Sequence, residues 1–165
     1  RCLVGSEMCI RDRSEPKELK AMVNGEVISV TEVKDDVFSS CMLGKGIAIH
    51  PTDGVVVAPV DGEISVTMEG TNHAVGIRIA EGFDLLIHIG LDTVSLNGEG
   101  FTSHISMGQK VKAGDKLITF DKALVESKGL CSDVILIALD NPALPALDFK
   151  TGMTASAGET VVATW

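Results

Sequence analysis

Short apolar runs separated by turn residues recur along the chain from about residue 20 to its end. Valine and isoleucine dominate these runs, and glycine beside aspartate, asparagine or glutamate often divides them. β-Branched residues favour strands, and Asn-Gly and Asp-Gly pairs favour tight hairpin turns. The pattern predicts strands over residues 45–50, 54–60, 63–68, 73–80, 83–90, 116–120 and 134–139.

One short helix interrupts this pattern of strands. Asp121 is placed to cap its N-terminus, residues 122–128 have a helical composition, and Gly129 ends it. Many short strands with frequent turn signals are typical of a β-sandwich or a flattened barrel. We therefore expect an all-β fold with at most short helices.

Two pairs of sequence repeats indicate an internal duplication. Residues 21–27 (AMVNGEV) resemble residues 58–64 (APVDGEI), and in both a turn pair precedes a β-type run. Residues 108–120 and 152–164 both contain a glycine, five residues, a second glycine, an acidic residue and then a strand pattern. The period is neither fixed nor repeated three times, so a solenoid is not expected.

The first thirteen residues lack any such pattern. RCLVGSEMCIRDR has neither helical periodicity nor the parts of a secretory signal, and it resembles a translated sequencing adapter. We interpret residues 1–13 as an artefact or a disordered tail, and residues 14–165 as a single domain. The remaining cysteines, Cys41 and Cys131, lack the spacing of a zinc site or redox pair and fit a reducing cytoplasm.

Charge and hydropathy exclude several classes of function. The chain of 165 residues carries a formal net charge of −9, and only 4% of its residues are aromatic. Nucleic acids and anionic membranes both favour positive charge, so neither is an expected partner. No apolar run approaches the roughly 20 residues of a membrane-spanning helix, so direct membrane insertion is not expected.

Two histidines are predicted to meet across a hairpin. His88 lies in the apolar run LLIHIG. If residues 81–82 form a two-residue turn, paired residue numbers sum to 163 and His88 faces Val75. His73 then lies on the same face at the diagonal position, about 7–8 Å away. A three-residue turn would place the two histidines on opposite faces.

A hydroxyl and a carboxylate share the strand parity of these histidines, from Thr71 and Asp92 respectively. A neutral imidazole is a nucleophile, and a second imidazole can donate hydrogen bonds to an anion, so the pair suits phosphoryl transfer. The pair could also bind zinc, but catalytic zinc usually has three protein ligands and the sequence has no HxH or HExxH motif. We expect no metal site, and we interpret His50 and His104 as structural or surface histidines.

Residues 86–101, LIHIGLDTVSLNGEGF, resemble the signature of the enzyme IIA domain of the glucose class in the bacterial phosphoenolpyruvate-dependent sugar phosphotransferase system. Residues 46–64, 71–74 (TNHA) and 108–121 also resemble this family, and the likeness extends over about residues 20–165. The FTSH run after the signature is closer to the β-glucoside and sucrose permease branch. The resemblance implies a β-sandwich with an internal duplication, which agrees with the repeats.

The resemblance also implies a function. His88 matches the phosphoryl acceptor, His73 its partner histidine, and Thr71 the threonine that supports His73. The domain would be a phosphotransferase that accepts a phosphoryl group from the phosphocarrier protein HPr and passes it to a cysteine of a IIB domain during sugar uptake. It would need no cofactor. It would work in the cytoplasm, either free or tethered to a membrane IIC domain at the inner face of the membrane.

A partner-binding surface is implied by further matches. The matching positions are Asp92 and Val94 on the rim of the surface, and Asp35 and Phe38 on a facing loop. Leu86 and Glu69 stand where enteric relatives carry phenylalanine, so the apolar docking face is altered here.

Three alternatives remain on the sequence alone. A zinc peptidase of the lysostaphin type has a similar duplicated β architecture, but it requires a third metal ligand in an HxH motif. Biotinyl and lipoyl carrier domains resemble the APVDGEI and VKAGDKL runs, but they modify a lysine at a hairpin tip that the sequence does not show. A regulatory IIA-like domain, phosphorylated but outside any transport pathway, is the main alternative.

Overall fold

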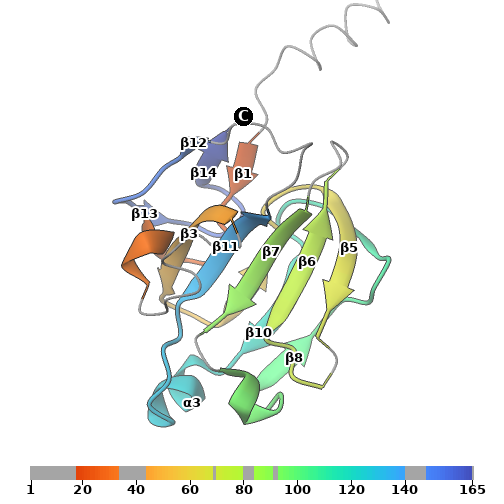
Figure 1. The fold of residues 1–165 in the computed structure, drawn as a ribbon, viewed down its shortest axis with the longest axis vertical. Helices are drawn as coiled ribbons and strands as arrows, with labels where there is room; N and C mark the ends of the chain where they lie inside the picture. Colours follow the sequence, from red (N-terminus) through yellow and green to blue (C-terminus); the bar gives the residue numbers. More distant parts are fainter. Residues whose placement is uncertain are drawn as a thin grey trace, which may run out of the picture.

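Strands make up most of the regular structure, as the sequence predicts. The computed structural model describes residues 18–33, 44–68, 70–79, 84–90, 93–139 and 148–164. These residues form three antiparallel sheets, two 3-10 turns, η1 (Val30–Glu32) and η2 (Thr93–Leu96), and one short helix, α3 (Lys122–Ser127). Figure 1 shows the strands of the largest sheet side by side, with α3 at one end of the molecule. The prediction of an all-β fold with at most short helices is confirmed.

The largest sheet has eight strands in the order β13–β2–β3–β11–β7–β6–β5–β9, and all neighbours are antiparallel. β7 and β11 pair at its centre. Its strands are β2 (Gly25–Ser29), β3 (Gly44–Pro51), β5 (Gly62–Thr67), β6 (Ala74–Arg78), β7 (Asp84–Ile89), β9 (Lys110–Val111), β11 (Val134–Leu139) and β13 (Thr154–Ala155).

Two three-stranded sheets complete the fold. One has the order β1–β14–β12 and joins the two ends of the described chain, because Glu18 pairs with Thr164. The other has the order β4–β10–β8. Their strands are β1 (Glu18–Lys20), β12 (Asp148–Phe149) and β14 (Val161–Thr164), and β4 (Val55–Val57), β8 (Phe101–Ser103) and β10 (Lys116–Phe120).

The predicted duplication is visible as equivalent hydrogen bonds. The amide of Gly114 donates to the carbonyl of Ala58 over 2.8 Å, and the amide of Gly158 donates to that of Ala21 over 2.9 Å. These donors and acceptors occupy matching places in the two pairs of sequence repeats. A second equivalent pair joins Ile64 to Gln109 and Val27 to Met153, at 2.8 Å each. Each half therefore builds the same local unit from one early and one late repeat.

Most apolar residues point to one main core. In β7 the residues Leu85, Ile87 and Ile89 are fully buried, while the alternate residues are only partly buried. This is the expected two-residue periodicity of a strand with one face on the core. The inward residues of β3, β10 and β11, such as Ile47, Leu117 and Leu136, pack in the same cluster.

The predicted helix lies at the predicted place. The carboxylate of Asp121 accepts a hydrogen bond from the amide of Leu124 over 3.1 Å, which caps the N-terminus of α3. Gly129, with a φ of 76°, takes the left-handed conformation that follows the end of many helices. None of the helices among the described residues is long and apolar enough to cross a membrane.

The predicted strand boundaries need some correction. The sequence predicts one strand over residues 54–60, but β4 covers only Val55–Val57. The reason is that the chain turns away there, since the amide of Ala58 donates to the carbonyl of Asp115 over 2.8 Å. The proposed tail, residues 1–13, lies outside the described residues, so the domain boundary at residue 14 stays a prediction.

Candidate functional site

His88 lies on the outer face of the central sheet because of the alternation in β7. Its neighbours Ile87 and Ile89 face the core, so the imidazole of His88 points to the other face and is partly exposed. On that face His88 lies opposite Ile135 of β11 and Ala74 of β6. An apolar strand therefore supports a polar ring among apolar neighbours.

His73 reaches the same place, but by a different route from the predicted one. In the β6–β7 ladder Ala74 pairs with His88, so paired residue numbers sum to 162 instead of 163. The predicted register is therefore wrong by one residue, and the residues at the proposed turn, 80–83, lie outside the described part of the chain. The rings of His73 and His88 nevertheless meet, with centroids 5.1 Å apart and planes at 79°.

A turn precedes β6 at this point. His73 precedes the first residue of β6, so the strict alternation of the strand does not apply to it. Asn72 has a φ of 51°, in the left-handed region, and its amide donates to the carbonyl of Met68 over 2.7 Å. The carbonyl of His73 then accepts from the amide of Ile89 over 2.7 Å. His73 thus lies between this turn and the first residue of β6, and the two imidazoles meet outside the regular alternation of the strand.

Thr71 contacts the His73 ring at Nδ1. Its Oγ1 is 2.7 Å from Nδ1 of His73, a short hydrogen bond between side chains. The same Oγ1 is 3.4 Å from the carbonyl of Met68, a much weaker contact. Burial lowers the pKa of His73 from its ordinary value, which favours the neutral ring near neutral pH.

An apolar surface lies beside His88 on the outer face of the central sheet. Its members lie in β2, β3, β7, β11 and η1 or within a few residues of them: Val30, Val33, Ala48, Ile135 and Ile137 are buried there, with Ile28, Leu86, Cys131 and Leu139 packed against them. Leu86 pairs with Gly76, and Gly76 pairs with Val66, whose exposed fraction is 41%. Gly76 has no side chain, so no side chain of β6 stands between those of Leu86 and Val66 at this position. We call the apolar residues listed above for this surface, from Ile28 to Leu139, the outer apolar face.

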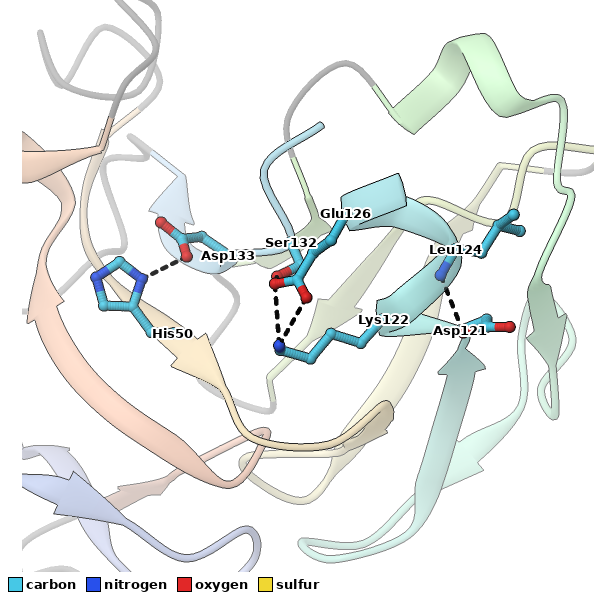
Figure 2. A network of polar contacts seen from close by, with 7 residues as sticks. All are labelled: His50, Asp121, Lys122, Leu124, Glu126, Ser132 and Asp133. Carbon is cyan, nitrogen blue, oxygen red and sulfur yellow. Dashed lines mark hydrogen bonds and ion pairs between the residues drawn. The ribbon is translucent and has the colours of Figure 1, made fainter. Parts of the chain in front are cut away.

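A network of polar contacts borders this face near α3 (Figure 2). Nδ1 of His50 and Oδ1 of Asp133 are 2.5 Å apart, and Asp133 is buried with 7% of its surface exposed. Lys122 pairs with Glu126 within the helix. The carbonyl of Asp133 accepts from the amide of Gly90, two residues after His88. His50 is thus partnered, and so is His104, whose Nε2 lies 3.1 Å from Oγ1 of Thr119.

Several predicted site residues lie outside the described structure. These are Asp35, Phe38, Glu69 and Asp92. Val94 falls in η2, but its side chain is not described. Among the described residues, no group of three or more histidine, cysteine, aspartate or glutamate side chains is placed to hold a metal ion. The site that the structure describes therefore consists of His88, His73, Thr71 and the outer apolar face.

Sequence reasoning missed the contact between His50 and Asp133. The two residues are 83 positions apart and come together only because β3 pairs with β11. Both strands have apolar sequences that match many possible registers, so no local signal indicates this contact. The contact between Thr71 and His73, which are two residues apart, is the kind that sequence parity does indicate.

The comparisons with known proteins agree on one family. Residues 17–143 match the family model of the phosphoenolpyruvate-dependent sugar phosphotransferase system, EIIA 1. The chain is 44% identical over 150 residues to a glucose-specific EIIA component of Bacillus anthracis, covering 91% of this chain and 90% of the relative. It is 46% identical over 136 residues to the component of the same name from Oceanobacillus iheyensis, covering 80% and 81%.

A solved structure supports the same conclusion on the fold. The glucose permease IIA of Mycoplasma capricolum superposes with a TM-score of 0.80 at 38% sequence identity. The match covers 91% of this chain and 96% of that one.

Proposed function

The chain belongs to the EIIA 1 family of the phosphoenolpyruvate-dependent sugar phosphotransferase system, and we propose that it carries the phosphoryl group of that system on Nε2 of His88. As a member of this family it is a phosphotransferase and a phosphoryl carrier in sugar transport. The names of its relatives do not favour the alternative of a regulatory domain outside transport. Which sugar it serves is a property of the membrane component.

The observation that carries the assignment is the pair of perpendicular imidazoles, 5.1 Å apart, on an apolar sheet face. Nδ1 of His88 is buried against the protein. Nε2 is therefore the ring nitrogen of His88 that faces an incoming group. An apolar surround excludes water, which strengthens the hydrogen bonds that a phosphoryl group receives and protects it from hydrolysis.

Thr71 selects the tautomer of His73. A hydroxyl has one proton, and the 2.7 Å contact with Nδ1 of His73 is far stronger than the 3.4 Å contact with the carbonyl of Met68. We propose that this hydroxyl donates to Nδ1 in place of the carbonyl of Met68, so that the single proton of the neutral His73 ring lies on Nε2. From there His73 donates a hydrogen bond to a phosphoryl oxygen beside His88.

The transfer then follows from these positions. The lone pair on Nε2 of His88 attacks phosphorus in line, a bond between Nε2 and phosphorus forms, and the bond between phosphorus and the donor breaks. The leaving group takes the electron pair of the broken bond. His73 stabilises the negative charge on the equatorial oxygens, which is the main task of a protein in phosphoryl transfer. The second transfer, to the next acceptor, runs through the same geometry with His88 as the leaving group.

The outer apolar face is the proposed docking surface for both partners. The donor is HPr and the acceptor is a cysteine of a IIB domain, and both must bring their reacting atom to Nε2 of His88. Leu86 lies two residues before His88 on the same face of β7, and Ile135 lies opposite His88 in β11. Asp35, Phe38, Asp92 and Val94 are proposed to extend the surface. We place these reactions in the cytoplasm, with the domain free or tethered to a IIC domain.

Phosphoryl labelling tests the assignment. The protein should take up an acid-labile, base-stable phosphate when incubated with phosphoenolpyruvate, enzyme I and HPr. His88→Ala should take up none, whereas His50→Ala and His104→Ala should label at the wild-type level, because their rings contact Asp133 and Thr119 instead. Labelling that persists in His88→Ala would refute the choice of acceptor.

A further inference from the structure

A tight turn near the two histidines contains an asparagine followed by glycine. Asn97 and Gly98 have φ values of 53° and 85°, and the amide of Glu99 donates to the carbonyl of Leu96 over 3.0 Å. Positive φ at both central residues with this hydrogen bond is the type I′ turn, for which Asn-Gly is preferred. Asn97 is exposed, and its side-chain amide forms no hydrogen bond with another described residue.

This arrangement is chemically vulnerable. The backbone nitrogen of Gly98 can attack Cγ of Asn97, because glycine has no side chain to obstruct the approach. A bond forms between this nitrogen and Cγ, the bond from Cγ to the side-chain nitrogen breaks, and ammonia leaves with a proton. Water then opens the resulting five-membered imide at either carbonyl. The products are aspartate and isoaspartate, and isoaspartate carries one additional methylene group in the main chain.

The second Asn-Gly pair of the chain is protected by its contacts. Oδ1 of Asn24 accepts from the amide of Ala157 over 2.6 Å, and Nδ2 donates to Asp53 over 2.8 Å. Gly25 lies in β2, between β3 and β13. Both the side chain and the attacking nitrogen are therefore held in place at Asn24, whereas the side chain of Asn97 makes no such hydrogen bond with the described residues.

The turn also supports the arm that carries Thr71 and His73. A Cβ atom on Gly98 would lie only 2.2 Å from the carbonyl oxygen of Gly70 and 3.6 Å from Cα of Thr71, so the two backbones are in close contact. An additional methylene group between Asn97 and Gly98 would lengthen this turn, break its closing hydrogen bond and displace Gly98 from Gly70. Thr71, which follows Gly70 directly, would then lose its support and its position on Nδ1 of His73.

We propose that Asn97 is a site of spontaneous deamidation, and that its isoaspartyl product disables phosphoryl transfer by releasing Thr71 and His73. The second half of this proposal rests on the function proposed above, whereas the first half does not. The reaction needs only water, and it accelerates with pH because the attacking backbone nitrogen must lose a proton. The fraction of molecules with isoaspartate at position 97 would therefore rise with the age of the protein.

Ageing of the intact protein tests the modification. Trypsin places Asn97 in the peptide 79–110 and Asn24 in the peptide 21–34, and neither peptide contains another asparagine. After ageing at mildly alkaline pH, the peptide 79–110 should gain the mass of an amide converted to an acid. Two ordinary hydrogen bonds protect Asn24, so conversion of the peptide 21–34 should be about 30-fold slower. Equal rates for the two peptides would overturn the proposal.

Transfer measurements on the same samples test the consequence. Isoaspartyl methyltransferase labelling measures the isoaspartyl fraction, and this fraction should transfer phosphate at least about tenfold slower, since a displacement of about 1 Å is costly. Asn97→Gly keeps a residue suited to positive φ and cannot deamidate, so ageing should not slow it. Fresh Asn97→Asp has the new charge but a normal main chain, and it should transfer at the fresh wild-type rate.

The outcomes separate the two claims. Aged protein that contains isoaspartate at position 97 yet transfers at the fresh rate would overturn the support role of the turn. So would a fresh Asn97→Asp variant that is as slow as the aged protein. If fresh wild-type protein transfers no phosphate at all, the proposed function fails, but the peptide masses still decide whether Asn97 deamidates.

Discussion

Removing one hydroxyl should reveal how His73 works. In Thr71→Val the side chain keeps its shape, but the 2.7 Å hydrogen bond to Nδ1 of His73 is lost. A bond of this kind contributes about 1 kcal/mol net, which is about fivefold in the population of the tautomer with its proton on Nε2. The ring also loses the contact that fixes its orientation, and a displacement of about 1 Å can cost up to about 100-fold. We therefore expect transfer to slow by between about fivefold and about 100-fold.

Rapid-quench measurement of both transfers, from phospho-HPr and to IIB, is the assay. Nitrogen NMR of His73 should show the proton moving from Nε2 towards a mixture of tautomers. Thr71→Ser keeps a hydroxyl and should recover most of the rate. Thr119→Val is a matched control, because it removes a hydroxyl from His104 at 3.1 Å without touching His73 or His88. Wild-type transfer rates in Thr71→Val would refute the argument that Thr71 selects the tautomer.

Three further predictions concern the same face. His73→Gln keeps a donor of similar reach but not the imidazole, so it should still accept phosphate from HPr yet pass it to IIB about 100-fold more slowly; an unchanged rate would leave His73 as a mere neighbour. Burial lowers the pKa of His73 below its unfolded value, so its contribution to stability is present above about pH 6.5 and is lost as pH falls through the folded pKa. Denaturant unfolding should accordingly show the free energy of unfolding of the wild type falling towards that of His73→Gln in acid, and a difference that is constant with pH would contradict this. Leu86→Gln places an amide on the outer apolar face and should raise KM for phospho-HPr about tenfold with little change in kcat, whereas an unchanged KM would move docking away from Leu86.

Much of the fold could be predicted because its signals are local. Runs of valine and isoleucine, Asn-Gly and Asp-Gly turns, the cap at Asp121 and the glycine at position 129 all act within a few residues. The duplication could also be predicted, since both pairs of repeats retain their glycines. The pairing of β1 with β14 could not be predicted, because it joins residues that are far apart in the sequence and short strands have little sequence pattern.

The site was harder to predict than the fold. The meeting of His73 and His88 was predicted, but from a register that is wrong by one residue. The rings still meet because His73 precedes the first residue of β6, where strand alternation no longer decides the direction of a side chain, and sequence alone does not fix that strand boundary. The pair of His50 and Asp133 had no local signal at all. Its formation depends on the register between β3 and β11, which packing of the whole sheet determines.

The meeting of β1 and β14 has a consequence for how this molecule can be attached to others. Because Glu18 pairs with Thr164, the first and last described residues of the chain lie side by side. In Figure 1 the arrowhead of β7, the strand that carries His88, points away from the label at the C-terminus. A linker attached beside the β1–β14 pair would tether the domain without covering the end of β7. The site on β7 would remain accessible to one partner protein after another. The length of the linker would set how far the tethered domain can move to reach them.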